Sequence, residues 1–118
     1  YAIHSGIPLL YECISTPSGL MEWFADDVIH VKDIYTFIWE DSQEKARLLD
    51  EREGEFVSFQ WLDMPKDCYF EFRIKVDELT QEVALIITDF ANDEEVEEVK
   101  RLWDIEVHKL SHAIGTEG

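Results

Sequence analysis

The stretch NDEEVEEVKRLWDIEVHKLSHAIG, residues 92–115, decides the fold because it carries the longest helical period in the chain. Asn92 is a suitable N-cap, the glutamates after it lie beside the positive end of the helix dipole, and Gly115 ends the helix. Spacings of three and four residues place one set of apolar side chains on a single helical face. They are Val96, Val99, Trp103, Val107, Leu110 and Ile114. We expect a helix from about Asp93 to about Ile114, about 30 Å long, which is enough to cross a small sheet.

Upstream of this helix, apolar and polar residues alternate with period two, which predicts about six antiparallel strands in a meander. The expected strands are Asp27–Lys32, Tyr35–Glu40, Ser42–Arg52, Glu55–Leu62, Cys68–Asp77 and Glu82–Phe90. The alternation is cleanest in Cys68–Asp77, as an antiparallel strand with one solvated side requires. Ser42–Arg52 contains good helix formers and is also compatible with a helix. Its position between two strands favours a strand, with Ala46 and Leu48 pointing inward.

The N-terminal part predicts a short strand and a helical hairpin. Tyr1–His4 alternates like a brief strand, and Ser5 can cap a helix whose apolar face contains Leu9, Leu10, Cys13 and Ile14. Thr16 and Pro17 end that helix and start a second short one. The second helix carries Leu20, Met21, Trp23 and Phe24. One face of the curved antiparallel sheet must be covered, and only the terminal helix is long enough to cover it. The expected fold class is therefore α+β, with two short helices and one long C-terminal helix on the concave face of the sheet.

Composition restricts the classes of partner. The chain has 118 residues, which we expect to form one domain over residues 1–118. It contains 10 Lys and Arg residues and 27 Asp and Glu residues, so its net charge is −17. Nucleic acids and anionic membranes bind through clustered cations, so neither is an expected partner. Cys13 and Cys68 are too few for a disulfide scaffold, and no apolar run is long enough for a membrane span. We expect a cytoplasmic protein. Because the chain opens with Tyr1 rather than Met, a targeting segment that has been removed is the alternative.

Several segments resemble the helix-grip fold of the START-like (SRPBCC) superfamily. The most specific is Leu20–Phe24, within Ile14–Asp27, whereas the first strand, Tyr1–His4, is shorter than in the family. The other segments are Ser5–Tyr11, Phe37–Glu40, Phe59–Trp61, Phe70–Phe72, Ile87–Phe90 and the helix around Trp103. The pattern is most similar to small bacterial START-like proteins near the homologues of the activator of heat-shock-protein-90 ATPase.

The resemblance implies a cavity under the long helix, since the superfamily binds lipids, sterols or polyketides there. Its implied ligand-binding residues are Trp23, Phe24, Phe37, Trp39, Phe59, Trp61, Phe70, Phe72, Trp103 and Val107. The alternative for each residue is a plain core position. We expect the entrance between the second short helix and the start of the terminal helix, where the acidic surroundings favour neutral or cationic apolar molecules.

Side chains with possible chemistry have simpler structural explanations. One face of the terminal helix carries Asp104, His108 and His112 at a spacing that can bind a metal. The sequence has no HExxH arrangement, however, and polar residues at these positions are also expected where a helix faces solvent. The group Asp26, Asp27 and His30, like Glu40 and Asp41, is typical of an acidic turn. The two cysteines are expected to be unreactive, on inward faces. No catalytic motif, metal motif or cofactor motif is present.

Three hypotheses of function follow. The first is a module that binds a small apolar ligand between the sheet and the terminal helix. The second is a protein-interaction or co-chaperone module resembling activators of heat-shock-protein-90 ATPase, which meets a basic patch on its partner. The third is a cyclase-like or hydrolase-like enzyme, which needs two titratable groups in one cavity, and the sequence shows no such pair. The sequence therefore favours a binding protein over an enzyme, and it is compatible with a homodimer.

Overall fold

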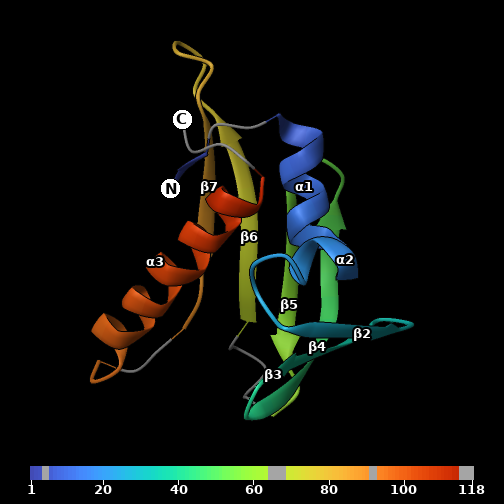
Figure 1. Cartoon of the computed structure of the whole chain (residues 1–118). Helices are drawn as coiled ribbons and strands as arrows, with labels where there is room; N and C mark the ends of the chain where they lie inside the picture. Colours follow the sequence, from blue (N-terminus) through green and yellow to red (C-terminus); the bar gives the residue numbers. More distant parts are fainter. Residues whose placement is uncertain (4–5, 64–68, 91–92, 115–118) are drawn as a thin grey trace.

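The computed structural model describes residues 1–3, 6–63, 69–90 and 93–114 (Figure 1). Within these ranges, the strands form one antiparallel sheet in the order β1-β7-β6-β5-β4-β3-β2. The strands are β1 Ala2–Ile3, β2 Asp27–Val31, β3 Ile34–Trp39, β4 Ser42–Arg52, β5 Phe56–Trp61, β6 Tyr69–Val76 and β7 Val83–Thr88. The helices are α1 Ile7–Ser15, α2 Pro17–Leu20 and α3 Val96–Ala113, all on one face of the sheet (Figure 1). This is the expected helix-grip α+β fold.

The strand predictions are confirmed with small shifts at their ends. Ser42–Arg52 is a strand over its whole predicted length, because it pairs with β3 on one side and with β5 on the other. Ala46 is buried and Leu48 half-buried, as expected. The pairing register of β4 shifts between Leu48 and Asp50, which is a β-bulge. The last strand ends at Thr88 rather than at Phe90, and the Phe90 side chain is exposed.

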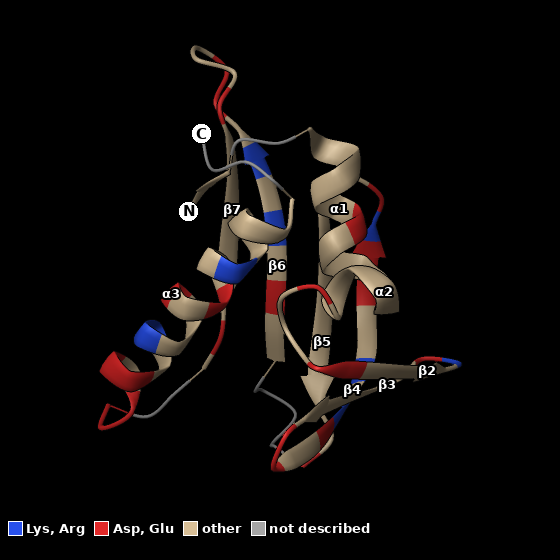
Figure 2. Cartoon of the chain, viewed as in Figure 1, with Lys and Arg blue, Asp and Glu red and all other residues tan. Residues whose placement is uncertain are grey.

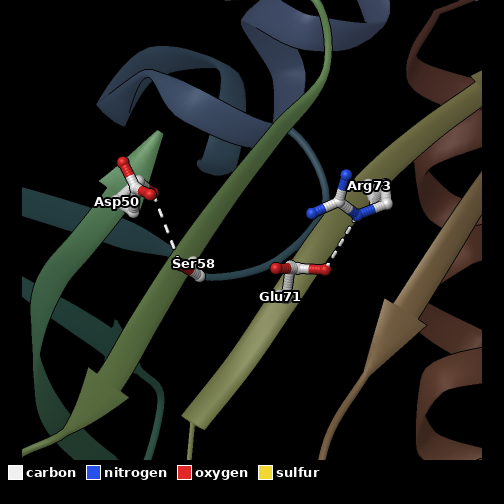
Figure 3. A network of polar contacts seen from close by, with 4 residues as sticks. All are labelled: Asp50, Ser58, Glu71 and Arg73. Carbon is white, nitrogen blue, oxygen red and sulfur yellow. Dashed lines mark hydrogen bonds and ion pairs between the residues drawn. The ribbon is translucent and has the colours of Figure 1, made fainter. Parts of the chain in front are cut away.

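Polar side chains contact one another on the face of the sheet opposite the helices (Figure 3). The Ser58 hydroxyl donates to the carbonyl oxygen of Asp50 at 3.4 Å, and Arg73 Nε lies 3.1 Å from Glu71 Oε2. The Arg73 guanidinium also lies over the Phe56 ring, 4.5 Å from its centroid. Partly exposed ion pairs of this kind contribute little to stability. The helix-covered face, by contrast, holds the apolar core.

The helical hairpin buries part of its predicted apolar face. Leu10, Cys13 and Ile14 are buried, but Leu9 is 45% exposed because it lies on the shoulder of the helix turned away from the sheet. The N-cap of α1 is Gly6, and the predicted cap Ser5 lies outside the described residues. The predicted apolar face is therefore buried except at Leu9.

The second helix is shorter than predicted. The Thr16 hydroxyl accepts the N–H of Gly19 at 2.9 Å, which confirms the predicted cap. The helix ends at Leu20, and a turn follows. That turn buries Trp23 and Phe24 and leaves Met21 42% exposed.

The long helix packs unevenly along its length. It begins at Val96 after Glu95 as N-cap rather than at Asp93, and the predicted cap Asn92 and stop Gly115 lie outside the described residues. Of its apolar stripe, the C-terminal members Val107 and Leu110 are buried, whereas the others are only half-buried. Figure 1 shows the N-terminal end of α3 leaning away from the strands. The helix therefore seals the core only in its C-terminal half.

Candidate functional site

A continuous cluster of aromatic rings fills the interior between the sheet and the helices. Phe24 lies at its centre, with its ring centroid 5.0 Å from that of Phe37 and 5.8 Å from that of Phe72. Phe70 stacks on Phe59 at 5.1 Å. Four phenylalanines on the helix-covered face of the sheet are completely buried; they are Phe37, Phe59, Phe70 and Phe72. These rings form a solid core.

A cavity opens at the edge of this core, under the N-terminal half of α3. We call it the tryptophan cavity; its volume is about 370 Å³. Its walls are formed by Phe24, Trp39, Trp61, Asp89, Val99, Leu102, Trp103 and Glu106. It reaches the surface beside Leu102, which is 54% exposed. The three tryptophans that line it are half-buried, unlike the sheet phenylalanines. The cavity is thus a mainly aromatic space at the surface.

Hydrogen bonds and ring contacts hold the tryptophan rings in place. Trp39 Nε1 donates to the carbonyl oxygen of Phe24 at 2.8 Å, and Trp103 Nε1 donates to Asp89 Oδ2 at 3.0 Å. The Trp103 ring stacks on Phe24 with centroids 5.7 Å apart and planes 8° apart. Trp61 stacks on Phe70 at 4.6 Å. The indole N–H groups of Trp39 and Trp103 are already bonded, so the walls that these rings present are apolar.

A second cavity of about 320 Å³ adjoins the first along α3. It is lined by Tyr1, Ile87, Asp89, Phe90, Val96, Val99, Lys100 and Trp103. Because Asp89, Val99 and Trp103 line both cavities, the Trp103 ring and its bond to Asp89 stand between them. A change in the Trp103 rotamer would alter the shape of both spaces.

Two carboxylates lie in the walls of the tryptophan cavity, and they differ in their bonding. Both oxygens of Asp89 have donors, the N–H of Phe90 at 2.8 Å and Trp103 Nε1 at 3.0 Å. Glu106 Oε1 lies 3.6 Å from Lys109 Nζ, whereas its Oε2 is buried without a hydrogen-bond partner. Burial raises the pKa of Glu106, and the negative charge of Asp26 raises it further, although Lys109 opposes both effects.

Comparison with known proteins agrees with the architecture. Residues 1–116 match the START-like superfamily domain. The chain belongs to this family. Among solved structures, BfR322 from Bacteroides fragilis is 38% identical, with a TM-score of 0.66 over 95% of this chain and 85% of that one. A comparison with curated proteins gives no match.

More distant structures share the fold of this START-like domain. The Aha1 dimer from Colwellia psychrerythraea is 15% identical, with a TM-score of 0.79 over 97% of this chain and 91% of that one. CalU16 from Micromonospora echinospora is 12% identical, with a TM-score of 0.71 over 97% of this chain and 72% of that one. At these identities the likeness concerns the fold alone.

The structure divides the ligand-binding residues implied by the resemblance into two groups. Phe24, Trp39, Trp61 and Trp103 line the tryptophan cavity. The others lie in the core, away from its walls; they are Trp23, Phe37, Phe59, Phe70, Phe72 and Val107. Trp23, for example, is 3% exposed and donates from Nε1 to the carbonyl oxygen of Cys13 at 2.8 Å. The START-like domain therefore presents only part of its predicted aromatic set to the cavity.

Two residues that line the cavity are not predicted from the sequence; they are Asp89 and Glu106. The sequence pattern contains a signal for each of them. Asp89 continues the alternation by which Leu85 and Ile87 point inward, beyond the end of β7. Glu106 follows Trp103 by three residues, which places it on the same side of the helix. Neither signal shows that the two carboxylates line one cavity, because that depends on how α3 lies over the sheet.

The other candidate clusters do not form a site. In the described parts of the chain, no group of three potential metal ligands comes together. Asp104 accepts a hydrogen bond from the Tyr1 hydroxyl, and His108 is exposed. The His30 ring stacks on Tyr35 at 4.1 Å, while the Asp27 carboxylate accepts the N–H of Val28. Glu40 and Asp41 occupy the exposed turn between β3 and β4.

Cys13 is 5% exposed, and burial raises the pKa of its thiol to about 11, with Glu12 and Glu22 adding to the effect. A thiol with a raised pKa is a poor nucleophile at neutral pH. Cys68 lies outside the described residues. No helix within the described ranges is long and apolar enough to cross a membrane.

Proposed function

We propose that this START-like domain binds a small apolar ligand in the tryptophan cavity. One observation carries the proposal: Trp39, Trp61 and Trp103 stay half-buried around a cavity of about 370 Å³, while the neighbouring sheet phenylalanines are completely buried. Ligand pockets usually have volumes of roughly 300 to 1,000 Å³ and mostly apolar walls. The cavity has the size and the lining of such a pocket.

The energetics of the walls favour an apolar occupant. Removing apolar surface from water stabilises a complex by about 25 cal/mol per Å². The indole N–H groups of Trp39 and Trp103 already donate within the protein, so a ligand does not need to satisfy them. A hydrocarbon or ring system can therefore cover these tryptophans without leaving the N–H groups unpaired.

The charge around the cavity selects against anions. The chain has a net charge of −17, and Glu106 and Asp89 lie in the cavity wall. Figure 2 shows further acidic residues at the start of α3 and in the loop between α2 and β2. Negative charges around a cleft repel anionic ligands and attract cations. We expect neutral or cationic apolar molecules to bind better than fatty acids.

The test is a titration with a neutral acyl ester and with a fatty acid of equal length, followed by calorimetry and by tryptophan emission. Val99→Phe adds a ring in the cavity wall and should abolish ester binding while the melting temperature changes little. Val31→Phe is the matched control, because Val31 is 63% exposed on β2. Ester binding that survives Val99→Phe unchanged would refute the proposed location. Native mass spectrometry of freshly expressed protein checks independently for a co-purified ligand.

A second candidate function is a protein-interaction module, and one observation favours it. Leu102 and Ile105 are 54% and 48% exposed on α3, beside the tryptophan cavity, on a strongly acidic domain. A partner with a basic patch and a projecting apolar side chain fits such a surface. The test is the ATPase rate of heat-shock protein 90 with and without this domain. An unchanged rate excludes the activator role, and sedimentation of the same protein reports whether it forms a homodimer.

A further inference from the structure

Strand β2 forms an open edge of the sheet. It pairs with β3 along its whole length, Asp27–Val31, and no strand of the described residues pairs with its other side. In an antiparallel pair, every second N–H and C=O of a strand points away from its neighbour, so β2 presents backbone groups at this edge that a further strand can bind. The N–H of Val28 donates to the carboxylate of the preceding Asp27 at 2.9 Å, a local bond that a partner strand can replace.

This edge lacks the usual protection against pairing. Edge strands are commonly kept short, or carry charged residues, prolines or bulges. At the opposite edge, β1 has only two residues, Ala2–Ile3, whereas β2 has five, of which only Asp27 is an Asp, Glu, Lys or Arg. Ile29 and Val31 are 49% and 63% exposed, on the face of the sheet opposite the buried Val28. The edge therefore combines unpaired backbone groups with exposed β-branched side chains.

We propose that two copies of this chain pair through their β2 strands, antiparallel about a two-fold axis at Ile29, so that the two sheets form one continuous sheet. Successive side chains on a strand point to opposite faces, so residues that lie opposite each other across the new pair must share a face. The axis therefore passes through a residue rather than between two. With the axis at Ile29, this side chain meets Ile29 of the second copy, and Val31 meets Asp27 of the second copy.

The charges at the two ends of β2 favour this register. Asp26 and Lys32 flank the strand, and both are exposed. An axis at the central residue of β2 brings Asp26 of each copy opposite Lys32 of the other. An axis at His30 would instead bring Asp27 opposite Asp33. Opposite charges across a strand pair are stabilising and like charges are destabilising, so the edge is complementary to itself about its central residue.

The net charge of −17 opposes association of two copies, but the place of β2 limits this effect. Figure 2 shows the acidic start of α3 on the side of the molecule away from β2. Exposed charges that are farther apart than about 10 Å are largely screened at ordinary ionic strength. A pair of five-residue strands makes a small interface, so we expect a weak dimer, with a Kd on the order of 100 µM.

Sedimentation equilibrium from about 10 µM to about 1 mM protein tests the proposal, because the mean mass should rise from monomer towards dimer over this range. Ile29→Lys places a charge on the paired edge and should weaken the dimer about tenfold or more. Ile86→Lys is the matched control, since Ile86 is 39% exposed on β7, on the same face of the sheet and away from β2. It should change the Kd by no more than about twofold. Melting curves establish that both variants are folded.

A charge exchange tests the register. Lys32→Asp and Asp26→Lys each bring like charges opposite each other and should each weaken the dimer about threefold to tenfold. The double variant, which carries both substitutions, should restore the native Kd. Net charge alone predicts a different result, because Asp26→Lys makes the chain less acidic and would strengthen the association.

Several outcomes would overturn the proposal. A native chain that stays monomeric over the whole concentration range rejects self-association. A dimer that Ile29→Lys leaves intact, or that Ile86→Lys weakens equally, does not form through the β2 edge. A double variant that remains as weak as the single variants rejects the axis at Ile29. The β2 edge lies outside the walls of the tryptophan cavity, so this inference is independent of the proposed ligand binding.

Discussion

The two ends of α3 share one apolar stripe but have different surroundings. Towards the C-terminus, Val107 and Leu110 are 5% and 0% exposed. Beyond Leu110, Ala113 and Ile114 at the end of the helix line a smaller cavity of about 230 Å³ together with Gly19 of the helical hairpin. Towards the N-terminus, Val99 and Trp103 are half-buried and line two cavities. One amphipathic helix therefore closes the core around Val107 and Leu110 and borders the two larger cavities towards its N-terminus.

The reason lies in what faces the helix across the sheet. The α1–α2 hairpin covers the sheet only as far as Phe24, after which the chain turns into β2. Beyond that point, no helix formed by the described residues fills the space between α3 and the strands, and Trp39 and Trp61 line this space. The difference predicts that stability and the proposed ligand binding depend on different parts of a single helix, and four substitutions test this separation.

The largest expected effect is at the sealed end. Leu110→Ala removes a completely buried side chain and should lower the free energy of unfolding by about 2 to 5 kcal/mol. Leu102→Ala, on the same helix but at a 54% exposed position, should change it by no more than about 0.5 kcal/mol. Urea unfolding measures both. Similar losses in the two variants would mean that α3 is packed evenly, contrary to the comparison.

Gly19→Ala tests the close packing of the hairpin beside that end. A Cβ at Gly19 would lie 2.1 Å from the carbonyl oxygen of Glu12 and 2.7 Å from Cys13 Cα, so the backbones of α1 and α2 must separate. We expect a loss of about 1 to 3 kcal/mol, as for overpacked cores. Gly6→Ala is the control, because the nearest atom to its added Cβ is Pro8 Cδ at 3.8 Å. Thermal melting should show the larger shift for Gly19→Ala.

Trp103→Ala should have a smaller effect on stability than truncation of a fully buried ring, which removes about 3 to 5 kcal/mol. Trp103 is half-buried and part of its ring already borders a cavity, so we expect about 1 to 2 kcal/mol. Ligand affinity should fall much more, since the substitution removes a wall and frees Asp89 Oδ2. A variant that loses stability like Leu110→Ala but keeps its affinity would assign Trp103 to the core instead.

Glu106→Gln should stabilise the unliganded protein slightly. The pKa of Glu106 is raised mainly by burial, so the folded state binds the proton more tightly than the unfolded state does. The stability linked to this group is fully present below its unfolded pKa and is lost as pH rises through its folded pKa. At pH 7 the amide should therefore raise the free energy of unfolding, and this gain should shrink as the pH falls towards pH 4. A gain independent of pH would contradict the assignment to a buried carboxylate.

Much of the fold follows from periodicity that is visible in the sequence. Alternation identified the strands, because successive side chains on a strand point to opposite faces. Thr16 followed by Pro17 marked the junction of α1 and α2, because a proline disfavours helical backbone in the residue before it. The helical stripe from Val96 to Ile114 identified α3. These are local properties of the chain, so they can be inferred without knowledge of tertiary contacts.

The sequence by itself determined which side chains share a face, but only the tertiary structure decided which of those faces meet another element. The spacing of Val99 and Trp103 resembles that of Val107 and Leu110, yet the first pair borders cavities and the second is sealed. Likewise, Phe59 and Trp61 are two residues apart on β5 and point to the same face of the sheet, but only Trp61 lines the tryptophan cavity. Asp89 and Glu106 line that cavity together because α3 passes over the end of β7. Periodicity reports the direction of a side chain, whereas burial depends on the volume filled opposite it, and here distant parts of the chain fill that volume.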